Sequence, residues 1–431
     1  MRSLFSLSAK LTSGVLACWL GASLLPAAEP VRLTYWNWAP HIEKVVDIWN
    51  RKNPDVQVRI SRAAGALEIV PKLLAADRAG NPPDVTNVTY QDLPALIVNG
   101  LVANLTPEMA PLQTNTSPVA WNLVNFGGVT WAAPQGTSPM MFYYREDLFQ
   151  EYGLEVPKTW AEFARVAKKL RQIQPQRFLT TFPTAEPGLF AALTHQLGSS
   201  WWKLEGDDWT ISIANRSGRR VAEFWQDLVA SDAVATSQHW SPEWSSAIAE
   251  GRMLGFISAV WAPPLLANIA PATKGKWNVA PLPRWGEADG TSYAGGVMGG
   301  SATAVSAKTR HPAEAKRFAL WITSDPEALE AYIRLVAIWP ANLSARHSPA
   351  LANAPAFIPQ KTDFYPMATA IDLDTPKISW GPNVSTTFDA FRNAFAKAVR
   401  RKSGFVEALE TVQRTAVRDM RSQGYIVHEG N

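Results

Sequence analysis

Short apolar runs alternate with longer helical patterns from residue 31 onward, and this rhythm limits the fold more than any other feature of the chain. The expected order is strand, helix, strand, helix, strand, over Val31–Trp36, His41–Lys52, Val56–Ile60, Leu67–Ala79 and Asp84–Val88. A βαβαβ order is typical of a parallel, doubly wound sheet, which binds ligands at the carboxyl ends of its strands. The sequence therefore predicts the α/β class.

A second series of elements follows the first and indicates a second α/β lobe. Strands are expected at Met140–Tyr144, Met253–Ser258 and Trp277–Ala280, and helices at Thr159–Ile173, Arg219–Ser231, Pro312–Ile322, Pro326–Val336 and Val384–Lys402. With 431 residues, the chain is long enough for two lobes. No Gly/Ser-rich tract separates them, so we expect short ordered crossings rather than a tether.

The first 28 residues are typical of a secretory signal peptide. Arg2 and Lys10 precede and open an uncharged apolar run, Leu11–Leu25, which is too short to span a bilayer. Cys18, the single cysteine, lies inside this segment, so cleavage near Ala28 leaves a mature chain without thiols or disulfides. A lipid anchor on Cys18 is the alternative. Either way we expect a periplasmic or secreted protein.

Charge and motif content exclude several classes of function. The formal charge is +4 and the longest basic run is Arg400–Lys402, which argues against a nucleic-acid partner. The six histidines are scattered, without the helical spacing of a zinc hydrolase. No Gly-x-Ser-x-Gly elbow and no phosphate-binding glycine loop is found. We therefore expect no metal and no cofactor.

Tryptophan is the unusual component, with 19 residues against 9 tyrosines. Aromatic planes cover the C–H faces of a sugar, while charged or amide groups bond to its hydroxyls. Aromatic residues follow several predicted strands or lie in Pro-flanked loops, where a ligand could reach them. These candidates are Trp36, Trp38, Tyr90, Trp240, Trp261, Trp339 and Trp380.

A dozen short motifs in order make the chain resemble the family 1 extracellular solute-binding proteins of ABC importers, the group that includes maltose-binding protein. The resemblance spans nearly the whole mature chain. Its pieces include Tyr35-Trp36-Asn37-Trp38, Pro83-Asp84-Val85, Asn99–Leu105, Phe142–Phe149, Pro157–Trp160, Glu250–Met253, Val260-Trp261, Pro281–Pro283 and Pro312–Ala315.

That resemblance implies a two-lobed periplasmic-binding-protein fold, doubly wound sheets joined by short hinge crossings near 133–138, 284–290 and 336–342. The expected segments are 1–28 (signal), 29–137 and 287–338 (N-lobe), and 138–286 and 339–431 (C-lobe). It also implies a monomeric binding component that is not an enzyme. Such a protein captures a carbohydrate between its lobes and delivers it to the membrane permease subunits of an ABC importer.

The resemblance adds residues to the candidate ligand site. It places a stacking indole at Trp261, and it makes Glu186 a hydroxyl acceptor and the backbone of Gly295 and Gly296 a source of donors. Ser138, Tyr143 and Gln91 complete the expected set, with the Tyr143 hydroxyl directed at the cleft. The loop Thr89-Tyr90-Gln91-Asp92 departs from the family's pattern around its usual Asp, so the residue of this loop that meets the ligand stays open.

Two alternatives remain. A secreted glycoside hydrolase would also combine aromatic planes with carboxylates, but it needs two acids in one cleft, and only Glu186 qualifies. A binding protein for a polyol, a polyamine or another non-sugar solute is the other. A polyamine site would require several acids, which the predicted strand-end loops do not carry.

Overall fold

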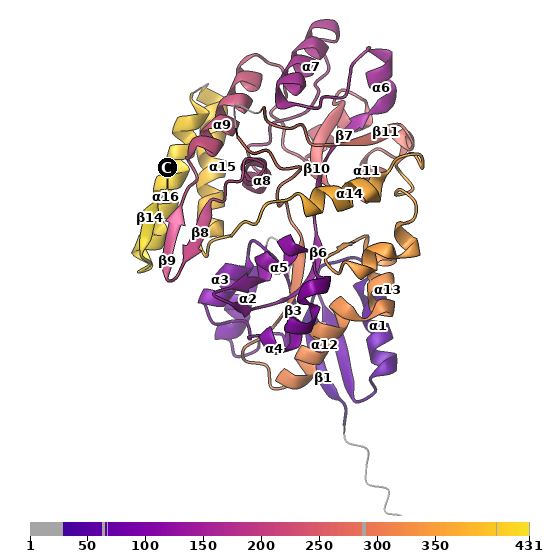
Figure 1. Ribbon diagram of the computed structural model, residues 1–431, viewed down its shortest axis with the longest axis vertical. Helices are drawn as coiled ribbons and strands as arrows, with labels where there is room; N and C mark the ends of the chain where they lie inside the picture. The colour runs from indigo at the N-terminus through magenta and orange to yellow at the C-terminus, as the bar shows by residue number, and fades with distance from the viewer. Residues whose placement is uncertain (1–28, 63–64, 67, 287–289, 402, 431) are drawn as a thin grey trace, which may run out of the picture.

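The computed structural model describes residues 29–62, 65–66, 68–286, 290–401 and 403–430, which form two lobes (Figure 1). The expected signal segment and Cys18 lie outside these residues. Within the described part of the chain, no helix combines the length and the apolar content that crossing a membrane requires.

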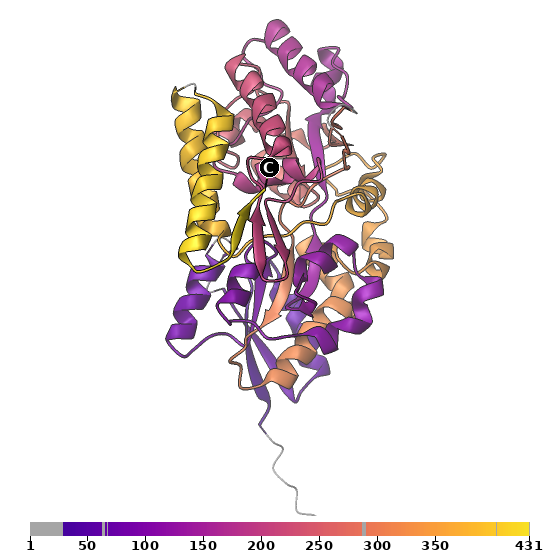
Figure 2. The ribbon, with the colours of Figure 1, turned by 60° about the vertical axis from the view of Figure 1, so that its left-hand side comes forward.

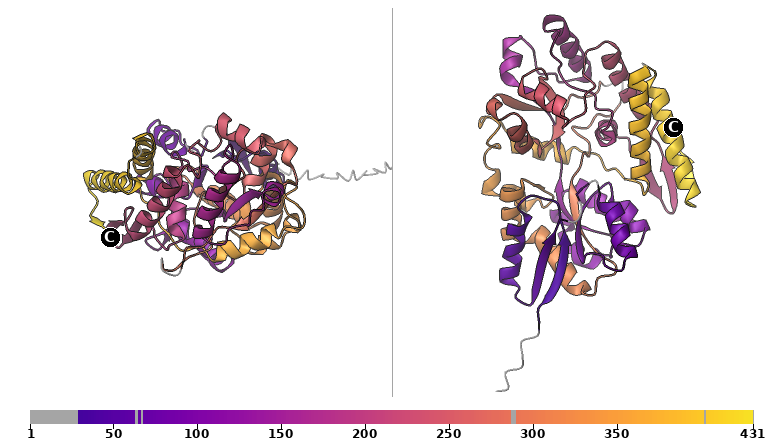
Figure 3. Two further views of the ribbon diagram at one scale, coloured as in Figure 1. Left: turned by 90° about the horizontal axis from the view of Figure 1, so that it is seen from above. Right: turned by 180° about the vertical axis from the view of Figure 1, so that it is seen from behind.

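The N-lobe, in the lower half of Figure 1, is built on a six-stranded sheet of order β13-β6-β12-β3-β1-β2. The view from behind shows this sheet between its helices (Figure 3). The first part of the chain supplies β1 (Val31–Trp36), α1 (Ile42–Lys52), β2 (Val56–Ser61), α2 (Ile69–Arg78), β3 (Val85–Thr89), α3 (Leu93–Val98), α4 (Thr106–Met109), a 3-10 turn (Ala110–Asn115), α5 (Pro118–Val124), β4 (Asn125–Phe126), β5 (Val129–Thr130) and β6 (Ala133–Thr137). A later segment returns with β12 (Ser301–Val305), α12 (Pro312–Ser324), α13 (Pro326–Val336) and β13 (Trp339–Pro340).

The predicted parallel sheet is confirmed for its first three strands only. β1 pairs in parallel with β2 and with β3, as the βαβαβ order requires. β12 then runs antiparallel to β3 and β6, and β13 antiparallel to β6. The sheet is therefore mixed, because its last strands come from a segment that returns from the other lobe.

The C-lobe holds a smaller, three-stranded sheet of order β10-β7-β11, and all its pairings are antiparallel. This corrects the expectation of a second parallel sheet. Its elements are β7 (Met140–Arg145), α6 (Glu146–Glu151), α7 (Trp160–Ile173), α8 (Pro187–His195), β8 (Trp202–Glu205), β9 (Asp208–Ile211), α9 (Arg216–Ala230), α10 (Pro242–Ala249), β10 (Gly255–Ala259), α11 (Ala262–Ile269), a 3-10 turn (Pro271–Thr273), β11 (Trp277–Pro281), α14 (Phe364–Leu373), α15 (Val384–Arg401), α16 (Phe405–Ser422) and β14 (Val427–Glu429).

The long α15–α16 hairpin flanks the C-lobe, next to the β8–β9 ribbon (Figure 2). Phe391 and Phe395 of α15 are stacked with ring centroids 4.0 Å apart, and Phe395 also contacts Phe405 and Phe190. The aromatic excess of the sequence thus supplies much of this core, since each such ring buries a large apolar area.

Three chain segments join the lobes. Ser138 and Pro139 link β6 to β7, residues 282–300 link β11 to β12, and residues 341–363 link β13 to α14. β13 pairs with a strand of the N-lobe sheet, although the sequence assigned residue 339 to the C-lobe. The third crossing therefore begins after β13, and the remaining lobe limits stay predictions.

Local chemistry explains several helix starts. The Thr159 hydroxyl accepts a hydrogen bond from the Glu162 N–H, and the Glu162 carboxylate accepts one from the Thr159 N–H, which is a capping box. Asn215 and Asp325 cap α9 and α13 more simply, since each side chain accepts one hydrogen bond from a backbone N–H of the first turn. The apolar segment Phe178–Phe182, which precedes Glu186 and has a strand-like sequence, forms no regular strand and makes only isolated bridges to Met253 and Ala235.

Candidate functional site

The carboxyl ends of β1 and β3 lie at the same edge of the N-lobe sheet, because the two strands are parallel. Trp36 ends β1 and Trp38 follows it, and both indoles are partly buried. Tyr90 and Gln91 directly follow β3; Tyr90 is buried, and Gln91 is partly exposed. Four predicted site residues thus gather at one edge.

The first crossing lies beside the second one at Gly299. A Cβ atom built on Gly299 would lie 3.5 Å from Ser138 Oγ and 3.8 Å from Trp261 Nε1. A small cavity of about 10 Å³, room for about one water molecule, is lined here by both lobes and both crossings. Its lining includes Tyr90, Ser138 and Gly299. Trp261 of the C-lobe is therefore placed at the junction of the lobes.

Trp240 meets Trp261 on the C-lobe, with ring centroids 6.0 Å apart and planes at 46°. Trp240 has a φ of 66°, a left-handed conformation that is unusual for a bulky residue, and the residue is 37% exposed. Strained backbone of this kind concentrates at functional sites. The two indoles present a bent aromatic surface that is only partly covered by protein.

Glu186 stands at the N-terminus of α8 but does not cap it, because its carboxylate turns to His239 instead. Oε2 of Glu186 lies 2.8 Å from Nδ1 of His239. The histidine side chain is buried, whereas the glutamate side chain keeps 21% of its surface exposed. Glu186 is therefore a partly accessible carboxylate with a fixed neighbour, His239, in the loop that carries Trp240.

Gln91 connects the N-lobe edge to α8. Its Oε1 lies 3.8 Å from where a Cβ of Gly188 would be, two residues beyond Glu186. Contacts thus run from the β3 loop to α8, through Glu186 and His239 to Trp240 and Trp261, and back to the first crossing. This chain of contacts connects the predicted site residues Gln91, Ser138, Glu186, Trp240 and Trp261. Tyr90 is buried and lines the cavity at the same junction.

Three aromatic candidates are placed differently from the sequence-based expectation. Tyr143 is fully buried and donates its hydroxyl to the Ala259 carbonyl at 2.8 Å, so the hydroxyl is not directed at a cleft. Trp339 is stacked on Tyr365 with ring centroids 5.7 Å apart. Trp380 is enclosed by the aromatic residues of the C-lobe core, Trp202, His195 and Phe388. Packing accounts for these rings without a ligand, and we withdraw them from the site.

Gly295 and Gly296 pack against helices rather than facing open space. A Cβ on Gly296 would lie 2.0 Å from the Ala192 carbonyl oxygen of α8, and one on Gly295 would lie 2.8 Å from the Ile371 side chain of α14. The absence of side chains allows the second crossing to run against both helices. This close approach explains the two glycines, and donation to a ligand is not needed to account for them.

A buried polar cluster joins the third crossing to α14 and to the end of β6, and we call it the hinge cluster: Ser117, Thr137, Arg346 and Asp372. Asp372, on α14, accepts hydrogen bonds from the Ser117 hydroxyl at 2.8 Å, from Arg346 Nη2 at 2.7 Å and from the Thr137 hydroxyl. The Arg346 and Asp372 side chains are 5% and 1% exposed. A charge pair this deeply buried requires all of its partners.

His195 lies behind the second crossing and is fully enclosed. Burial lowers the pKa of His195 to about 3, so the ring is neutral at ordinary pH. Its Nδ1 accepts a hydrogen bond from the Val297 N–H at 3.2 Å. This histidine therefore supports the second crossing structurally and is not a free base.

Asp92 is an acid that the sequence reasoning did not single out. It accepts a hydrogen bond from the Thr89 hydroxyl at 2.7 Å, in the same loop as Gln91. Burial raises the pKa of Asp92 from the ordinary 3.8 to about 6, and the Thr89 hydrogen bond opposes this shift. The sequence did not decide which residue of the loop Thr89–Asp92 meets the ligand. It also gives no indication that the Asp92 carboxylate is desolvated.

This shift predicts a pH dependence of stability. Between about pH 4 and pH 6 the folded state holds a proton that the unfolded state releases, so the contribution of Asp92 to stability falls as the pH rises. Above pH 6 the full cost of the buried carboxylate is present. Asp92→Asn keeps an acceptor for Thr89 and should be more stable than the wild type by roughly 1–3 kcal/mol at pH 7.5, and similar to it at pH 4.

Urea unfolding at the two pH values measures this difference. Asp227→Asn, which alters an exposed carboxylate paired with Lys168, is the control. A difference between Asp92→Asn and the wild type that is the same at both pH values would refute the shift.

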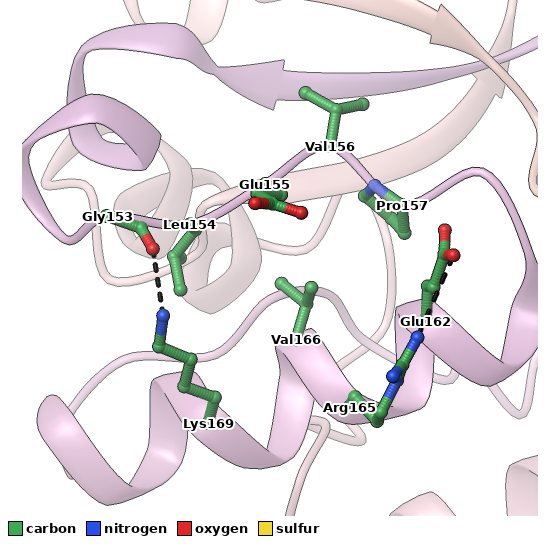
Figure 4. Close-up of a pocket in the computed structure, with 9 residues that line it drawn as sticks. All are labelled: Gly153, Leu154, Glu155, Val156, Pro157, Glu162, Arg165, Val166 and Lys169. Atoms are coloured by element: carbon green, nitrogen blue, oxygen red, sulfur yellow. Dashed lines mark hydrogen bonds and ion pairs between the residues drawn. The ribbon is translucent and has the colours of Figure 1, made fainter.

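Figure 4 shows a second hollow, a groove of about 280 Å³ between α7 and the loop after α6. Three of its charged groups have partners: Lys169 Nζ donates to the Gly153 carbonyl at 2.8 Å, and Arg165 pairs with Glu162 at 3.7 Å. No aromatic residue lines it. The groove therefore lacks the planes that a sugar requires.

The side chains at the lobe junction are suited to hydrogen bonding and to stacking on a ligand. Among the residues that the structure describes, no group of three or more His, Cys, Asp or Glu side chains is placed to hold a metal ion. The junction supplies two partly exposed indoles, a carboxylate anchored by a histidine, an amide and a serine. These groups suit a polyhydroxylated ligand that has apolar faces.

The comparisons with known proteins agree with this chemistry. The family model described as bacterial extracellular solute-binding protein matches residues 44–359. The multiple sugar-binding protein of Streptococcus mutans is 22% identical over 335 residues, which cover 70% of this chain and 73% of that protein. The mannitol-binding protein of Pseudomonas aeruginosa is 24% identical over 328 residues, with coverage of 69% and 71%.

A solved structure is similar along almost the whole length. The galacto-N-biose/lacto-N-biose I-binding protein of the ABC transporter from Bifidobacterium longum, in complex with lacto-N-biose, superposes with a TM-score of 0.81 at 25% identity. The match covers 93% of this chain and 99% of that one. The two-lobed fold is thus shared with a sugar-binding protein.

Proposed function

The chain belongs to the bacterial extracellular solute-binding proteins, and from this premise we propose that it captures a carbohydrate between its lobes for an ABC importer. The observation that carries the proposal is the pair Trp240 and Trp261 at the lobe junction, beside the carboxylate of Glu186. The indoles would cover a sugar face, and Glu186 with Gln91 would bond to its hydroxyls.

Capture would work by closure of the two lobes around the sugar. Binding groups come from both lobes and from the first crossing, so a single ligand stabilises the arrangement in which they meet. The closed form would then deliver the sugar to membrane permease subunits. We further propose export by the segment 1–28, a monomeric state, and binding without catalysis.

A thermal screen tests capture. The probes are lacto-N-biose, maltose, N,N′-diacetylchitobiose and mannitol, each offered to the purified protein over a range of concentrations. A sugar at about 100 times its dissociation constant stabilises the folded state by roughly 2.7 kcal/mol, which raises the melting temperature visibly. We expect at least one sugar to raise it and every sugar to be recovered intact.

Chromatography of the recovered sugars separates binding from the glycoside hydrolase alternative. Cleavage that disappears in Glu186→Gln would favour the hydrolase. A shift with mannitol alone would favour polyol capture. If none of the probes shifts the melting temperature at millimolar concentration, the proposal of sugar capture loses its support.

A further inference from the structure

We propose that His239, which no part of the proposed function uses, is a positioning residue that fixes the Glu186 carboxylate for a ligand hydroxyl. The inference rests on the proposed function, since it assigns how one binding group is held. The first observation is the contact itself: Nδ1 of His239 lies 2.8 Å from Oε2 of Glu186, across 53 residues of sequence.

The second observation is that the whole loop bearing His239 is fastened to the loop bearing Glu186. The Thr181 hydroxyl donates to the Ser237 carbonyl at 2.7 Å. Gln238 accepts a hydrogen bond from the Ala185 N–H at 2.8 Å and donates to the Thr184 hydroxyl at 2.7 Å. With the His239–Glu186 contact, four side-chain bonds connect residues 181–186 to residues 237–239. A glutamate in an unpaired loop would lack this support.

The third observation concerns what surrounds the histidine ring. Trp244, Trp240 and Phe256 lie edge-on or tilted to it, with centroid distances of 5.2, 6.2 and 6.4 Å. Its Nε2 is buried and has no hydrogen-bond partner in the structure, so the polar contact of the ring is the one to Glu186. The aromatic enclosure sets the ring plane, and the ring plane sets where the carboxylate stands.

The two oxygens of the Glu186 carboxylate would therefore have different roles. Oε2 faces the imidazole, and the partly exposed side chain leaves Oε1 as the acceptor for a ligand. Trp240 follows His239 directly, so the same loop also delivers an exposed indole. One anchored loop would thus place both a hydrogen-bond acceptor and a stacking plane, and a site of this kind loses affinity when the anchor goes.

The experiment compares two replacements of the histidine. His239→Phe keeps an aromatic ring among its neighbours but removes the nitrogen that meets Glu186. His239→Asn is smaller, but its amide nitrogen can occupy the position of Nδ1 and donate to the carboxylate. We expect His239→Phe to weaken binding of the panel sugar with the largest thermal shift by about 5- to 100-fold, and His239→Asn to retain most of the affinity.

Two controls accompany the calorimetric titrations. His428→Phe breaks a surface contact between His428 Nε2 and Asp208 at 3.0 Å on the β9–β14 side of the C-lobe and should leave affinity unchanged. Glu186→Gln changes the other member of the His239–Glu186 pair and should also weaken binding. It tests the pair independently if His239→Phe does not fold. Equal losses in the Phe and Asn variants, or no loss in either, would overturn the positioning role.

Hydrogen exchange without any sugar keeps this inference separate from the proposed function. Backbone amides of residues 184–186 and 188 should exchange faster in His239→Phe than in the wild type and in His239→Asn. If no probe binds the wild-type protein, the proposed function fails, while the exchange rates still decide whether His239 fixes Glu186. Unchanged exchange in His239→Phe would contradict the anchor directly.

Discussion

Asp372→Ala is expected to destabilise the folded protein by about 3–5 kcal/mol. The reason is the hinge cluster: removal of the carboxylate leaves Arg346, only 5% exposed, with a buried charge and no counter-ion. The hydroxyls of Ser117 and Thr137 lose their acceptor at the same time. Urea unfolding at neutral pH measures the difference.

Two further variants define the cause. Adding Arg346→Met to Asp372→Ala removes the uncompensated charge and should restore part of the stability, because an apolar pair can replace a buried ion pair. Asp389→Ala removes an exposed carboxylate, 70% accessible and paired with Arg392, and should cost no more than about 1 kcal/mol. A small loss in Asp372→Ala, or no recovery in the double variant, would show that the cluster is not under this constraint.

Trp261→Ala is expected to lose about 1–3 kcal/mol of sugar binding, roughly 5- to 150-fold in affinity, by analogy with stacking on nucleic-acid bases. Trp261 is only partly buried, and its ring contact is with the exposed Trp240. Truncation therefore opens no large cavity, so most of the ligand-free stability should remain. Calorimetry with the best sugar of the panel and a ligand-free melting curve are the two measurements.

Trp277→Ala is the matched comparison. Trp277 is fully buried, bonds through its indole N–H to the Thr273 hydroxyl at 2.9 Å, and should cost about 3–5 kcal/mol of stability when truncated. Trp261→Ala should thus lose sugar affinity and keep its stability, whereas Trp277→Ala should lose stability. Unchanged sugar affinity in Trp261→Ala, or a melting temperature as low as that of Trp277→Ala, would remove Trp261 from the site.

Regular patterns made part of the fold predictable. Val31–Trp36 and Pro326–Val336 have the expected bounds, because alternation and helical spacing report burial directly. β6, with the sequence APQGT, was missed: all five of its residues are buried, but the segment contains proline, glutamine and glycine. Its pairing with β12 depends on a segment more than 160 residues away in sequence, which no local pattern reports.

The candidate site shows the same limit. Trp261 and Trp339 both lie within two residues of a proline, and their sequence surroundings did not separate them. Tertiary contacts separate them: among the described residues Tyr365 and Arg346 enclose Trp339, whereas the ring contact of Trp261 is with the exposed Trp240. His239 was one of six scattered histidines until the fold placed it against Glu186. Sequence could supply the residue types, while their exposure and partners required the structure.

The left-handed backbone at Trp240 has a consequence for any attempt to engineer this protein. At a φ of 66° any residue other than glycine costs roughly 1–2 kcal/mol, which opposes the packing of the indole against Trp244, His239 and Trp261. Selection for heat resistance alone would act on this backbone cost and on the packing, not on the exposed part of the indole, and could discard the aromatic surface. A heat-resistant variant that lost this surface would bind its sugar weakly. Thermal stability and sugar affinity would therefore have to be selected together.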